Sequence, residues 1–191
     1  MKSSLDVKLT AGLAIVVFAI LAILKGDQFA KEILSVFSTA ISWTVLGRLL
    51  YVKWLWKTKP FRWLGFVHKV PYLEGKWTGE YHSTGNPNTP PDRLRGAAEV
   101  EICQPSIHTI KIIRRSAEST SRSFGEEFLY GDDGITQVIY SYMSEPKATV
   151  RHRSAISYGS ARLTLDKAAQ ILEGDYWTDQ KTTGTLSLQK N

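Results

Sequence analysis

Residues 48–69 read RLLYVKWLWKTKPFRWLGFVHK, and this stretch divides the chain into two parts of different character. It contains six lysines and arginines, three tryptophans and no acidic residue. Basic residues that follow an apolar segment are typical of the cytoplasmic side of a membrane, and tryptophan is enriched at the membrane interface. We therefore interpret residues 54–70 as a basic, aromatic juxtamembrane linker.

Two uncharged apolar stretches precede this linker, LTAGLAIVVFAILAIL at 9–24 and ILSVFSTAISWTVLG at 33–47. A bilayer core of roughly 30 Å takes about 20 helical residues, so each stretch spans once its flanking residues are included. Residues 25–32 leave room only for a tight turn. The sequence predicts a transmembrane helical hairpin over residues 1–53. The alternatives are a soluble helical hairpin and, for the first stretch, a secretory signal peptide.

The charge distribution predicts the orientation of this hairpin. The net charge is +1 over residues 1–47, +6 over 48–69 and −1 over 70–191. Because loops rich in Lys and Arg stay in the cytoplasm, both termini are expected to be cytoplasmic. The basic charge is matched to anionic membrane lipids, so we expect no direct DNA or RNA binding.

Residues 71–191 change to a hydrophobic period of two, with β-branched and aromatic segments between turn residues. The Asp-Asp-Gly sequence at 132–134 predicts a hairpin turn, 157–160 a weaker one, and the proline-rich stretch 84–95 a surface loop. We expect about eight strands, over roughly 75–83, 96–104, 107–116, 123–130, 135–144, 149–157, 161–165 and 170–178, with a closing strand at 183–189.

Short antiparallel strands of this number leave exposed edges unless the sheet closes. The predicted fold is therefore membrane-anchored and all-β: two N-terminal transmembrane helices followed by a small antiparallel β-barrel over residues 71–191. A barrel of about eight strands is wide enough either to be filled by side chains or to hold one small ligand. Function then depends on which side chains point inward.

Nothing in the sequence assembles into an active site. The four histidines have no metal-ligand spacing, Cys103 is the single cysteine, and no nucleophile or phosphate-loop motif is present. We expect a protein that is not an enzyme and that uses neither a cofactor nor a metal.

Binding residues are easier to propose. Arg151 and Arg153 share one face of the predicted strand 149–157, and Val150, His152, Ser154 and Ile156 occupy the other. Two guanidinium groups on one strand can bind a phosphate. The alternative is that they face solvent. Arg114 and Arg115 are adjacent, so they point to opposite faces, and the sequence leaves open which of them points inward.

Aromatic and hydroxyl residues complete the candidate site. Trp77 and Tyr176 each follow a glycine by two positions, where a core aromatic at a barrel corner is the alternative interpretation. A pocket that stacks bases and binds their edges would suit a ligand with two flat rings and two phosphates. The candidate ligand-binding residues are Trp77, Tyr81, Tyr142, Arg151, Arg153, Tyr176, Thr178 and Thr183.

The sequence also resembles a known family. The resemblance rests on two N-terminal spans, the basic aromatic junction, LEGKWTGEY at 73–81, LEGDYW at 172–177 and TTGTL at 182–186. This combination is similar to the two-transmembrane β-barrel effectors of CBASS antiphage systems.

The resemblance implies a sensor of a cyclic dinucleotide made by a partner nucleotide synthase. Binding would cause homo-oligomerisation and disruption of the inner membrane, with abortive infection as the result. The second stretch contains small residues that permit close helix contact, although they would equally suit a two-helix hairpin within one chain. The competing hypotheses are a membrane-tethered, lipocalin-like carrier or sensor of an apolar ligand, and an assembly scaffold whose barrel is filled.

Overall fold

A computed structural model describes residues 2–25, 33–58, 60–61, 70–84, 94–131, 134–166 and 168–191. The chain divides into two compact units, Met1–Val70 and Pro71–Asn191. Most of the turn predicted at 25–32 and of the basic stretch 59–69 lies outside the described residues. So do Asp132, Asp133 and most of the predicted loop 84–95.

The first unit contains helix α1 (Lys2–Lys25), helix α2 (Ile33–Lys53) and the short 3-10 helix η2 (Leu55–Lys57). The rings of Phe18 and Phe37 meet edge to face at 5.7 Å, and a Cβ at Gly47 would lie 3.1 Å from Leu13. Residues near the start of α1 thus contact residues near the end of α2, so the two helices run antiparallel. Val36, Ala40 and Thr44 are buried and spaced by four, the helical repeat of one contacting face.

Of the described helices, one segment is long and apolar enough to cross a membrane, Ser35–Lys53. The apolar part of α1, Thr10–Leu24, is shorter. Two hydroxyls of α2 are satisfied within the helix, since Thr39 donates to the Ser35 carbonyl at 2.8 Å and Thr44 to the Ala40 carbonyl at 2.7 Å. Such internal bonding suits an apolar surrounding, where unpaired polar groups are costly. A two-pass anchor stays a prediction.

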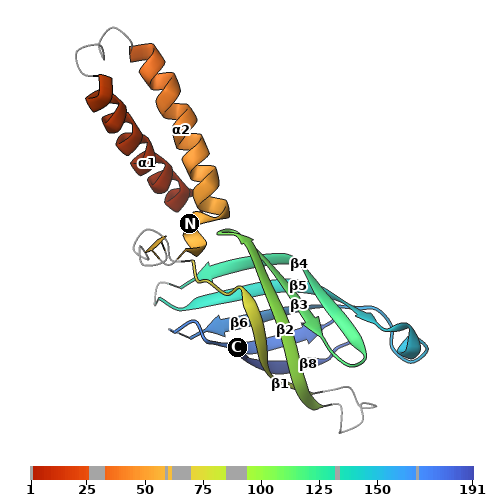
Figure 1. The fold of residues 1–191 in the computed structure, drawn as a ribbon. Coiled ribbons are helices and arrows are strands. Elements are labelled where there is room, and N and C mark those ends of the chain that lie inside the picture. Colours follow the sequence, from red (N-terminus) through yellow and green to blue (C-terminus); the bar gives the residue numbers. More distant parts are fainter. Residues whose placement is uncertain are drawn as a thin grey trace. The chain divides into compact units, whose positions relative to one another are not determined.

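The second unit is a closed antiparallel barrel in which each strand pairs with the next and β1 pairs with β8, as Figure 1 shows. The closed barrel predicted from the sequence is confirmed. Its strands are β1 (Gly75–Ser83), β2 (Arg95–Ser106), β3 (Thr109–Arg115), β4 (Ser119–Tyr130), β5 (Thr136–Pro146), β6 (Ser157–Leu165), β7 (Ile171–Thr178) and β8 (Thr183–Lys190).

Alternation places one face of each strand inside the barrel. In β2, for example, Ala98, Val100 and Ile102 are buried, whereas Ala97 and Glu99 are exposed. This period-two burial follows from side chains that point to opposite faces along a strand. Closure leaves the sheet with no free lateral edge except where a strand pair separates.

Two local predictions were wrong. Residues 149–157 do not form a strand; they begin with the 3-10 helix η4 (Ala148–Val150), and Arg151 has helical φ −59° and ψ −27°. Residues 157–160 are not a turn but the first residues of β6. Gly134 does have a positive φ of 81° between β4 and β5, in the part of the predicted hairpin turn that the structure describes.

Candidate functional site

Three tyrosines at one end of the barrel lie directly opposite glycines of neighbouring strands. The register pairs are Tyr81 with Gly96, Tyr142 with Gly159, and Tyr176 with Gly184. Each tyrosine stands late in an odd-numbered strand and each glycine early in the next strand. The antiparallel order therefore brings all three pairs to the same rim of the barrel.

Glycine leaves room opposite these rings, because each ring lies against the neighbouring backbone. A Cβ at Gly96 would come within 2.9 Å of the Tyr81 ring, and one at Gly159 would come within 2.5 Å of Cζ of Tyr142. The third pair is equally close. An aromatic ring that covers a glycine in this way is held along the wall of the sheet. At this end the rings therefore line the interior instead of filling it.

Arg114 places a positive charge among these rings. It stands opposite Val100 of β2 and Ser121 of β4, which are both buried, so its side chain points into the barrel. Its guanidinium carbon lies 4.6 Å from the centroid of the Tyr81 ring, within cation–π range. Within the described part of the chain, its buried Nε has no hydrogen-bond partner. Since buried polar atoms are nearly always paired, this nitrogen is a candidate donor to an anionic ligand.

A pocket opens between Arg114 and the tyrosines. The space open to a water-sized sphere is about 20 Å³, room for about one water molecule, and the empty volume at its mouth, open solvent included, is about 370 Å³. The lining is mixed, with one cation, three phenols and one hydroxyl beside two aliphatic groups. The lining residues are Ile112, Arg114, Ser121, Tyr140, Tyr142, Tyr176 and Leu186.

The surroundings of two of the phenols raise their pKa values further above neutral pH. Burial raises the pKa of Tyr142 to about 12, against the opposing effect of Arg114. Burial also raises the pKa of Tyr140, and neighbouring Tyr142 adds to the shift. Because a neutral phenol retains its O–H, both hydroxyls stay hydrogen-bond donors at physiological pH.

The opposite end of the barrel is filled by its own side chains. Trp77 is completely buried there, and its indole N–H donates to the Leu73 carbonyl at 2.9 Å. Gln104 is also fully buried and binds the entering chain, accepting from the Leu73 amide at 3.0 Å and donating to the Pro71 carbonyl at 3.1 Å. Trp77 therefore lies in the core and apart from the pocket, which matches the alternative interpretation of a core aromatic.

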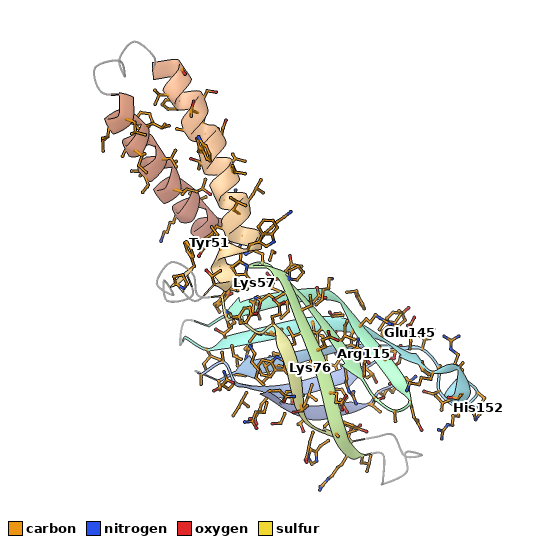
Figure 2. All side chains as sticks on the ribbon, viewed as in Figure 1. Tyr51, Lys57, Lys76, Arg115, Glu145 and His152 are labelled. Carbon is orange, nitrogen blue, oxygen red and sulfur yellow. The ribbon has the colours of Figure 1, made fainter. Side chains whose placement is uncertain are left out.

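Arg151 and Arg153 are not on a barrel strand, because the predicted strand that carried them is a turn. Both are exposed, and Arg153 forms an ion pair with Glu118 at 2.7 Å. Neighbouring His152 lies beyond the ends of the strands in Figure 2. The structure does not bring these arginines together with the tyrosines of the pocket.

The two predicted threonines lie at the rim close to Tyr176. Thr178 shares a hydrogen bond with Thr182 in the connection between β7 and β8. Thr183 and Thr84 bond to each other through their hydroxyls at 3.0 Å. Of the eight candidate residues, Tyr142 and Tyr176 therefore line the pocket, and Tyr81 contacts the Arg114 that lines it. Thr178 and Thr183 border the same end of the barrel.

The candidate residues chosen from the sequence did not include Arg114, Ser121 or Tyr140. The signal for Arg114 was its parity with Ile110 and Ile112, which are both buried on β3. Arg115, its neighbour, points outward and pairs with Glu101 at 2.5 Å. Within the described residues no group of His, Cys, Asp or Glu side chains could hold a metal ion.

Comparison with known proteins identifies the family. Residues 68–190 match the family described as Cap15, cyclic dinucleotide receptor domain. CD-NTase-associated protein 15 of Staphylococcus schleiferi is 26% identical over 184 residues, which cover 96% of this chain and 94% of that protein. The chain therefore belongs to the Cap15 family, and its resemblance to the β-barrel effectors of CBASS systems is confirmed.

Proposed function

We propose that this CBASS effector binds a cyclic dinucleotide in the pocket around Arg114. The observation that carries the proposal is a guanidinium with a buried, unpaired Nε, in a tyrosine-lined pocket of a cyclic dinucleotide receptor domain. A cyclic dinucleotide carries two negative charges and two flat bases. The pocket offers a cation for the first feature and aromatic rings for the second.

The residues divide the recognition between them. Arg114 donates to a phosphate, for which a guanidinium is well shaped. Tyr81, Tyr142 and Tyr176 present rings for base stacking, and the Tyr142 hydroxyl, neutral below about pH 12, donates a hydrogen bond. Thr178 and Thr183 are placed to contact base edges at the rim. We expect no such role for the exposed Arg151.

The lining argues against an apolar ligand. Of the seven lining residues, Ile112 and Leu186 are the aliphatic ones. A lipid in this pocket would bury Arg114 beside hydrocarbon with no partner for its charge, which is costly. The aliphatic filling expected of a scaffold is found at the opposite, closed end around Trp77.

We further propose that α1 and α2 form a two-pass anchor in the inner membrane, with the N-terminus and the barrel in the cytoplasm. The apolar segment Ser35–Lys53 and the basic charge of residues 48–69 support this proposal. Exposed Trp54 suits the interface between lipid and water. Contact with membrane lipids is then a property of the helical unit and the linker.

Ligand binding is proposed to drive homo-oligomerisation through these helices and to disrupt the membrane, killing the infected cell. An apolar groove runs along the helical pair, lined in part by Ala14, Ala40 and Thr44, and small residues permit close helix packing in lipid. Binding shifts this equilibrium only if the assembled state binds the ligand more tightly than the monomer. The synthase that makes the ligand is the functional partner, as the name CD-NTase-associated protein 15 indicates for the relative.

The test uses the full chain in detergent micelles and a panel of cyclic di- and trinucleotides. We expect one cyclic dinucleotide to raise the melting temperature, and Arg114→Met to abolish that rise. Arg115→Met is the matched control, because it removes the neighbouring, outward guanidinium and should leave the rise intact. Equal losses in both variants, or no response to any member of the panel, would contradict the proposed site.

Assembly is measured separately by crosslinking in membranes with and without the stabilising cyclic dinucleotide. A shift to larger species is expected for the natural chain and not for Arg114→Met. Identical distributions with and without the nucleotide would exclude ligand-driven assembly.

A further inference from the structure

The barrel wall is weakest between β3 and β4. This pair of strands has three register pairs, Ile113–Arg122, Arg114–Ser121 and Arg115–Thr120. Each of the other seven neighbouring pairs has between six and eleven. Since a strand pair is held by its backbone hydrogen bonds, the β3–β4 seam needs the least work to separate.

A β-bulge ends the pairing at this seam. The register of β4 against β5 shifts between Ser123 and Gly125, so β4 follows β5 while β3 continues along β2. Phe124 in the bulge is 60% exposed, and a Cβ at Gly125 would meet nothing within 4 Å. Bulges bend a strand and interrupt its ladder. The outer side of this bend is thus largely exposed, and the Phe124 ring meets the ring of Tyr158 edge to face at 6.4 Å.

Three polar side chains close the seam where the backbone ladder stops. The Ile112 amide donates to the Ser123 hydroxyl at 2.8 Å, and that hydroxyl in turn donates to Glu126. Lys111 pairs with the same carboxylate at 3.2 Å. The Glu126 side chain is only 8% exposed, whereas that of Lys111 is 47% exposed. We name Lys111, Ser123 and Glu126 the latch.

The pocket borders this seam directly. Ile112, Arg114 and Ser121 line it, and all three belong to β3 or β4 next to the latch. The space open to a water-sized sphere is about 20 Å³, whereas pockets for drug-sized ligands occupy roughly 300–1,000 Å³. Two nucleosides and two phosphates therefore need a wider barrel than the one seen. Widening between β3 and β4 would enlarge the pocket with the fewest backbone bonds broken.

We propose that the β3–β4 seam opens to admit the ligand and that the latch holds it shut in its absence. The latch adds side-chain contacts between β3 and β4 beyond the last backbone register pair. Its ion pair is accessible from the barrel surface at Lys111. The inference rests on the proposed function for the identity of the ligand, although the opening itself is a property of the empty barrel.

The closing experiment locks the latch covalently. A water-soluble carbodiimide, added without free amine, joins Lys111 to Glu126 as an amide because the two groups are already in contact, and peptide mass spectrometry verifies the link. Lys111→Arg is the control, since it keeps the charge but forms no stable amide. On the full chain in detergent micelles, we expect locking to slow association of the stabilising cyclic dinucleotide at least tenfold. Treated Lys111→Arg should bind as the untreated protein does. Unchanged association of the locked chain would overturn the proposal.

A second measurement needs no ligand. Hydrogen–deuterium exchange of the empty full chain should be several-fold faster at the amides of β3 and of residues 119–123 than at those of β5 and β6. The substitution Lys111→Met should raise the exchange rate further, and only at the amides of the seam. If exchange at the seam is as slow as in β5 and β6, the proposal that the β3–β4 seam opens is overturned. If no cyclic dinucleotide binds the untreated chain, the proposed function fails and this measurement still decides whether the seam opens.

Discussion

Replacing Gly96 by alanine is expected to weaken cyclic dinucleotide binding while leaving the barrel folded. The new Cβ would lie 2.9 Å from both Cε1 and the hydroxyl oxygen of Tyr81, and 3.1 Å from Cζ. Ordinary van der Waals contact begins at 3.4 Å, so the ring must move away from the wall by about 0.5 Å. That movement displaces it relative to Arg114, whose guanidinium lies 4.6 Å from the ring centroid.

The two energetic effects differ in size. Gly96 is not among the described glycines with a positive φ, so alanine fits its backbone and gains about 0.4–1 kcal/mol from the less flexible unfolded chain. The clash involves the far end of a flexible side chain, so the two effects largely cancel in the free energy of unfolding. Binding loses part of a base stack, worth about 1–3 kcal/mol. A loss of about 1.4–2.8 kcal/mol raises Kd roughly ten- to a hundredfold.

Titration calorimetry of the full chain in micelles measures this Kd, and denaturant unfolding measures stability. Gly125→Ala adds the same methyl group where nothing lies within 4 Å, so its Kd should match that of the natural chain. In a Tyr81→Ala background, Gly96→Ala should have no further effect on Kd, since the ring through which it acts is gone. The reasoning is refuted if Gly96→Ala binds normally, or if it still weakens binding when Tyr81 is absent.

Three further predictions concern the rest of the barrel. Trp77→Ala should lower the free energy of unfolding by about 3–5 kcal/mol in denaturant titrations, and the exposed Trp177→Ala by less than about 1 kcal/mol; equal losses would contradict a core position for Trp77. Because burial raises the pKa of Tyr142 to about 12 from its usual value near 10, its contribution to stability is complete below pH 10 and lost as the pH rises toward 12. Between pH 8 and 11, the melting temperature of Tyr142→Phe should therefore fall less steeply with rising pH than that of the natural chain. An unchanged slope would exclude Tyr142 as a source of this pH dependence. Arg153→Ala removes an exposed ion pair and should change stability by less than about 1 kcal/mol and Kd not at all, whereas a tenfold rise in Kd would return Arg153 to the site.

Alternation and turn residues were sufficient to predict the closed barrel. The predicted strand 75–83 has the bounds of β1, and the closing strand 183–189 differs from β8 by one residue. The same alternation misled at 149–157, where arginines alternate with Val150 and Ile156. There the chain turns after Pro146, and Val150 is buried from a 3-10 helix. A short period-two pattern therefore does not distinguish a strand from a turn in which one apolar side chain is buried.

The candidate site was harder to predict because it depends on register. Arg114 has the parity of Ile110 and Ile112, but Ile113 has the parity of Arg115, so the local pattern is ambiguous. The pairing of Arg114 with buried Val100 decides that Arg114 points inward. Gly159 was interpreted as a turn residue, yet it lies within β6 because the Tyr142 ring occupies the place of its side chain. A glycine within a strand can thus indicate a ring on the neighbouring strand, a signal that requires the pairing to be known.

The two ends of the barrel differ in how completely their polar groups and strands are paired. At the closed end the Trp77 indole and the Gln104 amide are both bonded to the entering backbone. At the pocket end Arg114 has an unpaired buried nitrogen, and β3 and β4 separate one register pair deeper in the barrel, beyond Ile113–Arg122. Each departure from full pairing costs stability in the empty barrel. A charged ligand would compensate both, by pairing with the guanidinium and by filling the space that an opened seam creates. The closed end then provides the stability that allows the other end to remain incomplete until the ligand arrives.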